Sequence, residues 1–337
     1  MAVIYRGTIS SYYRTKNLLN FYESVVDGDA DGESLYLVVG RQEPWADNEN
    51  DVGFAPPYPY DEPAGYADIW QRSIGFVKIK ESSTVAIYPR RDFGDPSLGT
   101  LSYTFSIGDI VCTNTASYNH STGSGVDAGI MVYKCVDLPD TGSCSIDNVD
   151  SDADDAKEVC IGLGGTWYGD MATNIPTGKG TAIDTEDGYI WEYMYTIPPA
   201  IVVADVTDDY IVVPFPSDVA DDPAAWGLEN RISENMDVNR TIFEMKANLL
   251  RFKIPLSVAQ FPELADPSAK GFRQLSVLSS PFLVKTTYDE PSIIAQGDFY
   301  QSDELQSNSG EILYMENRQP VYKSTYQEEL VTITFSF

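Results

Sequence analysis

Hydrophobic and polar residues alternate at every second position along much of this chain, and such alternation predicts β-strands. At the C-terminus, Val331, Ile333 and Phe335 alternate with threonine and serine. In the segment GYIWEYMYTI, five residues fall on one face: Tyr189, Trp191, Tyr193, Tyr195 and Ile197. Further strands are predicted at residues 34–39, 74–80, 130–135, 210–213, 249–254 and 274–278. The pattern therefore predicts a mainly β protein built from antiparallel sheets.

Helical spacing of apolar residues is rare in comparison. A first helix is predicted after Ser10 or Ser11, from a stripe at i, i+3, i+4 and i+7 formed by Leu18, Phe21, Tyr22 and Val25. A second is predicted to begin near Pro63, because proline is favoured in the first turn of a helix. Its apolar side would carry Tyr66, Ile69 and Trp70. The expected fold class is α+β, with a few short helices beside antiparallel sheets or sandwiches.

A change in composition divides the chain into three predicted parts. From about residue 91 the sequence becomes rich in Gly, Ser, Thr and Asp, which is typical of turns and loops. We expect residues 1–90 to form an N-terminal α+β part and residues 91–239 a loop-rich β domain. Residues 240–337 are expected to form a C-terminal β part that packs with the N-terminal part. The loop-rich domain would then be an insertion between these two parts.

The charge of the chain narrows the classes of partner. The 337 residues include 51 acidic and 22 basic side chains, a net charge of −29. Nucleic acids and anionic membranes are bound by basic surfaces, so neither is an expected partner. The start MAVIYRGTIS lacks the features of a signal peptide, and no apolar run is long enough to span a membrane. We therefore expect synthesis in a cytoplasm, with four reduced cysteines at positions 112, 135, 144 and 160.

Motifs that could carry chemistry are incomplete. The single histidine, His120, lies in a Gly/Ser-rich segment, where an exposed loop histidine is expected. The segments TGKGT and GLGGTW lack the spacing of phosphate-binding loops and are expected to be turns. Asp27, Asp29 and Asp31 match the start of a calcium loop, but its twelfth position is Val38 instead of glutamate, so a solvated acidic turn is the default interpretation. We expect no catalytic residue, cofactor, metal or small-molecule substrate.

Rigid segments rich in Pro, Trp, Tyr and Arg are more distinctive. They are GRQEPW, NENDVGFAPPYP, PRRDFGD and ENRQP. Proline restricts the backbone, and Trp, Tyr and Arg are common anchors of protein interfaces. The candidate anchors are Trp45, Phe54, Pro56, Pro57, Tyr58, Arg90, Arg91, Trp191 and Arg318. The alternative interpretation is that these segments are ordered loops packed on their own domain, and in residues 48–59 we expect Phe54 and Tyr58 to pack inward.

The same segments resemble a known family, the baseplate wedge subunit encoded by gene eight in T-even-type contractile-tailed bacteriophages. The similar pieces run nearly end to end and include VIYRG, GRQEPW, NENDVGFAPPYP, VYKCVDLPDTGSCSI, DGYIWEYMYTIPP and SGEILYMENRQP. The resemblance implies a structural virion protein of the tail baseplate, made in the bacterial cytoplasm, that forms homodimers and docks to other wedge proteins. It also implies that the protein is not an enzyme. The alternative is a β-rich carbohydrate-binding or adhesin-type tail protein, in which Tyr189, Trp191 and Tyr193 would form an exposed platform.

Overall fold

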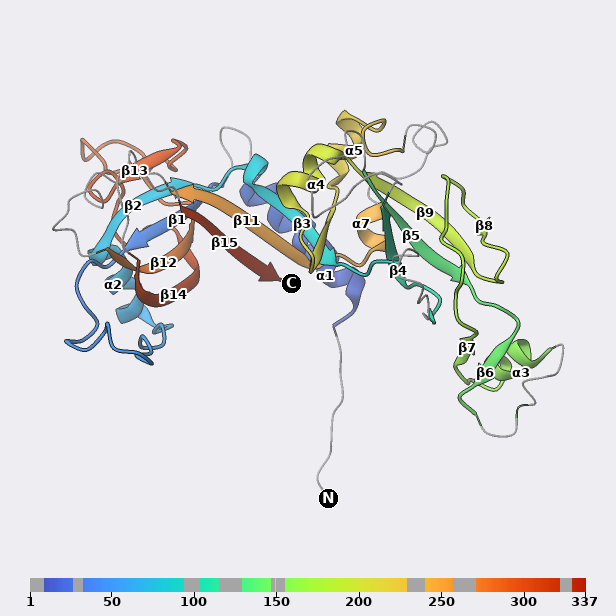
Figure 1. Ribbon diagram of the computed structural model, residues 1–337. Helices are drawn as coiled ribbons and strands as arrows, with labels where there is room; N and C mark the ends of the chain where they lie inside the picture. Colours follow the sequence, from blue (N-terminus) through green and yellow to red (C-terminus); the bar gives the residue numbers. More distant parts are fainter. Residues whose placement is uncertain are drawn as a thin grey trace, which may run out of the picture. The chain divides into compact units, whose positions relative to one another are not determined.

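The chain folds into two compact units (Figure 1). One consists of Met1–Val85 and Asn248–Phe337, and the other of Ala86–Ala247. The computed structural model describes residues 9–26, 33–93, 104–114, 129–146, 149, 155–228, 240–256, 271–321 and 329–337. Most regular structure in these ranges is antiparallel β sheet, joined by a few short helices, so the expected fold class is confirmed.

A five-stranded antiparallel sheet dominates the first unit. Its strand order is β13 (Phe299–Gln301), β2 (Ser73–Lys78), β1 (Leu35–Gly40), β12 (Phe272–Ser279) and β14 (Glu311–Val321). Every residue of β1 and β12 is buried, as expected for central strands with both faces covered. β14 is an edge strand and its residues are half-buried or exposed. The predicted strands at 34–39, 74–80 and 274–278 are confirmed.

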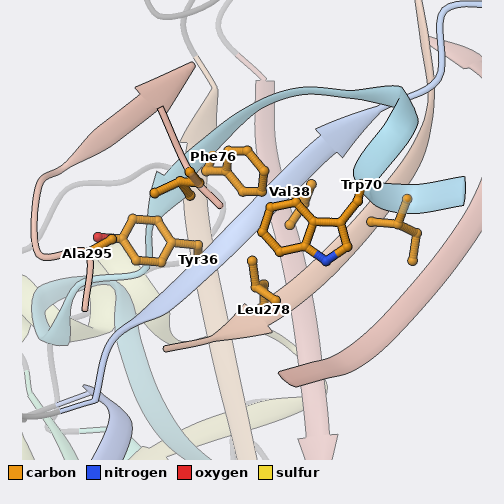
Figure 2. Close-up of a cluster of buried hydrophobic side chains, with 8 residues drawn as sticks. Tyr36, Val38, Trp70, Phe76, Leu278 and Ala295 are labelled. Carbon is orange, nitrogen blue, oxygen red and sulfur yellow. The ribbon is translucent and has the colours of Figure 1, made fainter. Parts of the chain in front are cut away.

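The helix α2 (Pro63–Arg72) supplies the hydrophobic cover for one face of this sheet. Ile69 and Trp70 are its buried residues, and the Trp70 ring lies 5.3 Å from the ring of Phe76 in β2. Figure 2 shows these rings beside Val38 of β1 and Leu278 of β12. The prediction of a helix starting at Pro63 is confirmed, and the helix places the loop that precedes it over the sheet.

The first unit also contains a two-strand ladder and the N-terminal helix. β11 (Leu249–Leu256) pairs antiparallel with β15 (Glu329–Ser336). The helix α1 (Ser11–Phe21) begins where the Ser10 side chain accepts a hydrogen bond from the Tyr13 amide, and it continues as a π-helical turn, η1 (Tyr22–Val26). Phe21 packs against Phe335 and Phe337. A 3₁₀ turn, η2 (Glu81–Ser83), completes this unit.

The second unit is built on a four-stranded antiparallel sheet. Its order is β4 (Ile110–Asn114), β5 (Ile130–Asp137), β9 (Ile190–Ile197) and β8 (Ile183–Asp184). β3 (Thr84–Pro89) pairs with β10 (Tyr210–Val213) through residues 86–89. The remaining elements are β6 (Gly142–Cys144), β7 (Trp167–Gly169), α3 (Ala156–Gly162), α4 (Pro199–Asp205), α5 (Pro216–Asp221) and α7 (Arg240–Glu244). The predicted strands at 130–135 and 210–213 are confirmed.

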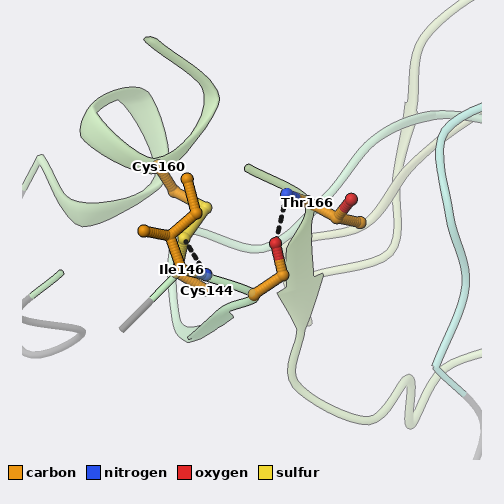
Figure 3. The surroundings of a disulfide bond; sticks show 5 residues. Cys144, Ile146, Cys160 and Thr166 are labelled. Atoms are coloured by element: carbon orange, nitrogen blue, oxygen red, sulfur yellow. Dashed lines mark hydrogen bonds between the residues drawn. A yellow bond between two sulfur atoms is a disulfide. The ribbon is translucent and has the colours of Figure 1, made fainter. Parts of the chain in front are cut away.

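A disulfide in the second unit corrects the expectation of four reduced cysteines. Cys144 in β6 is bonded to Cys160 in α3, with 5.8 Å between their Cα atoms (Figure 3). The short β6–β7 hairpin and α3 bring these two residues together, a proximity that their separation of 16 residues did not reveal. Cys112 and Cys135 are unbonded and buried, and burial raises the pKa of each thiol to about 12. Both therefore remain protonated and unreactive at neutral pH.

Candidate interaction site

The proline-rich segment 48–62, which we call the acidic loop, is fixed along the edge strand β14. Asn317 donates through Nδ2 to the carbonyl oxygen of Pro57 at 2.9 Å. Gln319 donates through Nε2 to the carbonyl oxygen of Phe54, also at 2.9 Å. Because proline lacks an amide proton, its carbonyl is the only backbone group through which Pro57 can be held. These two bonds support the interpretation of the loop as an ordered connector.

A buried ion pair holds the start of this loop to the sheet. Arg273 in β12 donates through Nε to Glu49 Oε2 at 2.7 Å, and its Nη2 contacts Glu49 Oε1. Its Nη1 donates to the carbonyl oxygen of Gln42 at 2.6 Å. The two side chains are only 1% and 4% exposed. The hydrogen bonds from Arg273 hold the pKa of Glu49 below its usual value, which outweighs the opposing effect of burial.

Trp45 is held between these groups. Its indole Nε1 donates to the carbonyl oxygen of Arg318 at 3.0 Å, and its backbone amide donates to Glu49 Oε2 at 3.0 Å. The guanidinium of Arg41 lies 3.9 Å from the ring centroid, in the arrangement of a cation–π contact. Trp45 and Arg318 were both candidate interface anchors, and the structure brings them together as parts of one half-buried assembly.

A cavity of about 220 Å³, which we call the loop pocket, opens beside this assembly. The loop side of the pocket is lined by Trp45, Pro57, Tyr58, Pro59 and Tyr60. The other walls come from α2, β12 and β14, through Ala64, Gly65, Asp68, Ile69, Gln274, Met315 and Asn317. α2 can approach the loop this closely because residue 65 is a glycine. A Cβ atom at this position would overlap the carbonyl oxygen of Tyr60. The pocket therefore has walls of aromatic and prolyl side chains and a rigid frame.

The surroundings of the loop pocket are acidic. Residues 41–72 contain seven carboxylates and two basic residues, Arg41 and Arg72. Arg273 neutralises Glu49, and Arg72 contacts both Asp68 at 2.5 Å and Glu43 at 2.8 Å. Within the part of the chain that the structure describes, no ion pair reaches the four remaining carboxylates, which are Asp47, Asp51, Asp61 and Glu62. The segment therefore carries a net negative charge that favours a basic partner, although Asp68 in the pocket lining is itself paired with Arg41 and Arg72.

The expectation that Tyr58 packs inward is wrong. The side chain of Tyr58 is 96% exposed, and Phe54 is half-buried. Pro56 and Pro59 are the half-buried members of the run and Pro57 is exposed. The flanking prolines fix the path of the backbone, and this path turns the Tyr58 ring to the rim of the pocket instead of the core.

Two further candidate anchors, Arg90 and Arg91, bind within the second unit. Arg90 contacts Asp92 at 2.8 Å and donates to the carbonyl oxygen of Thr207, and its side chain is 4% exposed. Arg91 contacts Asp109 at 2.6 Å and lies 4.7 Å from the centroid of the Phe105 ring. These contacts favour the interpretation of the described part of PRRDFGD, residues 89–93, as ordered and packed on its own unit.

Trp191 is a core residue. It is fully buried, and its ring packs edge-on against Phe105 at 5.0 Å and Phe93 at 5.7 Å. Tyr189 and Tyr193 are 0% and 1% exposed. The exposed aromatic platform expected of a carbohydrate-binding protein is therefore contradicted, because Phe93 and Phe105 cover Trp191 and most residues on both faces of β9 are buried.

The remaining motif predictions have mixed outcomes. TGKGT and GLGGTW form turns, with Gly178 and Gly164 in left-handed conformations. His120 and the aspartates at 27, 29 and 31 lie outside the described residues. In the described ranges, no group of three or more His, Cys, Asp or Glu side chains is placed to hold a metal ion. No helix in those ranges is both long and apolar enough to cross a bilayer.

Sequence reasoning missed the pair Arg273–Glu49 and the pocket residue Gln274. The two members of the ion pair are separated by 224 residues, and 51 acidic residues offer many alternative partners for one arginine. One signal was present: an arginine and a glutamine lie in β12 among residues that are otherwise apolar or small, where a buried charge requires a partner.

Comparison with known proteins gives the same family over nearly the whole chain. The family model Phage-Gp8, described as bacteriophage T4 Gp8, matches residues 7–337. The baseplate wedge protein gp8 of Enterobacteria phage T4 is 43% identical over 340 residues, which cover 100% of this chain and 99% of that protein.

Proposed function

Because the chain belongs to the Phage-Gp8 family, we propose that it is a structural component of the baseplate wedge in a contractile phage tail. The observation that carries this proposal is the end-to-end similarity to a protein named for that role.

The assignment to the baseplate is testable on purified phage tails. Antibodies raised against this chain should label the baseplate end of tails in electron micrographs, and the chain should be found by mass spectrometry of the same preparation. Preimmune serum and tails from an unrelated phage are the controls. Absence of the chain from intact tails would contradict the proposal.

We propose further that the chain forms a symmetric homodimer through the open edge of β15. Among the described strands, β15 pairs with β11 alone. The Phe337 amide donates to the Asn248 carbonyl, so odd-numbered residues of β15 turn their backbone groups toward β11. The backbone groups of Leu330, Thr332, Thr334 and Ser336 then face the open edge.

The sequence of β15 supports pairing at this edge. ELVTITFS contains no lysine, no proline and no bulge, the features by which proteins usually protect an open strand. The side chains of Leu330, Thr332 and Thr334 are exposed. Antiparallel pairing of β15 with the same strand of a second copy would be an isologous contact and would satisfy the outward amides.

The edge can be tested without disturbing the β11 ladder. Thr332→Pro removes an outward amide, and proline is tolerated on edge strands. In analytical ultracentrifugation the parent chain should sediment as a dimer and the proline variant as a monomer, while Thr332→Ala should remain a dimer. A monomeric parent chain would contradict dimerisation, and an unaffected proline variant would exclude this edge.

The acidic loop and the loop pocket are proposed as a docking face for neighbouring wedge proteins. The loop is held by its carbonyls and by the buried ion pair, so little conformational entropy remains to be lost when a partner binds. Tyr58 and Tyr60 are exposed at 96% and 57% on this face. Residues 91–239 are proposed as a domain inserted between residues 1–90 and 240–337. This view is supported by the continuous unit Ala86–Ala247, which lies in sequence between the two segments of the other unit.

A further inference from the structure

One residue that lines the loop pocket, Gln274, has a buried hydrogen-bond acceptor without a partner in the described part of the chain. Gln274 is 6% exposed and lines the pocket. Its Nε2 donates to Asn317 Oδ1 at 3.1 Å, whereas its Oε1 has no hydrogen-bond partner among the described residues. An unsatisfied buried acceptor destabilises a folded protein, because its hydrogen bond to water is lost without replacement.

The orientation of this amide follows from its neighbours. The Pro57 carbonyl can only accept a hydrogen bond, so the nitrogen of the Asn317 amide must face it. Asn317 Oδ1 then faces Gln274 and must receive a proton from Gln274 Nε2. Oε1 of Gln274 is consequently the atom without a partner among the residues described, and any group that binds to it must be a hydrogen-bond donor.

The walls of the loop pocket fit a flat cationic group. Tyr58 and Tyr60 supply aromatic rings in addition to Trp45, whose ring already contacts Arg41, and aromatic faces attract cations. Four carboxylates of the adjoining segment, which are Asp47, Asp51, Asp61 and Glu62, have no ion pair within the described part of the chain. At about 220 Å³ the pocket is smaller than the roughly 300–1,000 Å³ typical of small-molecule sites, which suits a single inserted side chain.

We propose that the loop pocket binds the arginine side chain of a basic segment in a partner protein. This inference rests on the proposed docking role of the chain and specifies the chemistry of the partner. A guanidinium combines five donors for Gln274 Oε1 and nearby acceptors with a planar surface for stacking on tyrosine or tryptophan. An ammonium is more strongly hydrated and lacks that plane, so lysine is expected to bind less tightly.

The test uses the full chain and short peptides. The probe is a capped Gly/Ser peptide with one central arginine, compared with the same peptide carrying lysine or uncharged citrulline. Binding is followed through the Trp45 indole N–H resonance in nuclear magnetic resonance spectra, assigned with Trp45→Phe. The arginine peptide should shift this resonance, the lysine peptide should bind several-fold more weakly, and the citrulline peptide at least tenfold more weakly.

Two variants locate the binding site. Tyr58→Ala should weaken arginine binding about threefold to tenfold, because one cation–π contact is lost. Since Tyr58 is 96% exposed, this change should leave the fold intact, and Tyr288→Ala at another tyrosine, 99% exposed, is the matched control without effect on binding. Gln274→Met should weaken binding about tenfold by removing the charge-assisted hydrogen bond.

Several results would overturn the inference: no shift with the arginine peptide, equal binding of citrulline or lysine, or unchanged binding by Tyr58→Ala. If the chain is present in purified tails but the arginine peptide does not bind, the inference fails while the proposed function stands. If the arginine peptide binds but the chain is absent from purified tails, the proposed function fails while the binding chemistry of the loop pocket stands.

Discussion

The ion pair between Glu49 and Arg273 provides the sharpest test of how the acidic loop is held. Glu49→Ala leaves the Arg273 guanidinium 1% exposed and without its carboxylate partner. Loss of one member of a buried pair typically costs about 3–5 kcal/mol. We therefore expect Glu49→Ala to lower the stability of the first unit by about this amount, close to the lower end of the total stability of many domains.

Removing the other member of the pair should lower the stability of the first unit by a smaller amount. Arg273→Met leaves Glu49 in the loop, where its carboxylate still accepts from the Trp45 amide at 3.0 Å. A shift of the loop can bring the Glu49 carboxylate into contact with water. Arg273 cannot move in this way, because it lies in the buried central strand β12. The double variant should therefore be more stable than the sum of the single changes predicts, by about 0.5–3 kcal/mol.

Amide hydrogen exchange in β12 is the suitable assay, because the chain has two units and global unfolding need not be a single transition. The cycle of parent, two single variants and double variant is measured at neutral pH. A cost below about 1 kcal/mol for Glu49→Ala, or strict additivity in the cycle, would refute the view that this pair fixes the loop.

The pH dependence of the same pair has a defined sign. The pKa of Glu49 is lowered in the folded chain, mainly by the hydrogen bonds from Arg273. A depressed carboxyl pKa contributes stability above the unfolded value of about 4.3, and this contribution is lost as the pH falls through the folded value. In Glu49→Gln the loss of stability below about pH 4.3 should accordingly be shallower than in the parent chain.

Three further predictions concern other parts of the fold. Trp191→Ala should destabilise the second unit by about 3–5 kcal/mol in hydrogen-exchange measurements, because it empties a fully buried site, and parent-like stability would contradict its core role. Cys144→Ser should lower the stability around α3 by up to about 3 kcal/mol, because the bond to Cys160 is lost, and proteolysis there should be faster. Dithiothreitol should have the same effect on the parent chain and none on the variant. Gly65→Ala should displace the loop at Tyr60, with a changed Trp45 indole resonance as the readout, whereas Ala64→Gly should leave that resonance in place.

The regular elements could be predicted from the sequence because their periodicity records burial. Alternation in β15 and the single run of β10 located strands to within two residues, and Pro63 marked the start of α2. These signals are local, since each residue's position on a strand or helix follows from its neighbours. The same alternation placed Trp191 on one face of β9 but did not say whether that face was covered.

The candidate site could be predicted only in part. The rigid segments GRQEPW and ENRQP were singled out, and they meet at the Trp45–Arg318 hydrogen bond. The loop pocket itself depends on contacts between residues more than 200 positions apart, such as Pro57 with Asn317. The disulfide was missed for a related reason: cytoplasmic synthesis argued for reduced thiols, and the distance between Cys144 and Cys160 is set by the fold.

The two proposed contacts respond to salt in opposite ways, and this separates them experimentally. Two copies of a chain with net charge −29 repel, so pairing of β15 strands should strengthen as salt screens that repulsion. An arginine approaching the acidic loop is attracted, so its binding to the loop pocket should weaken over the same range. Sedimentation and peptide titration at low and high ionic strength measure the two trends. If both contacts weakened with salt, the dimer would depend on ion pairs instead of backbone hydrogen bonds, and β15 would lose its main support.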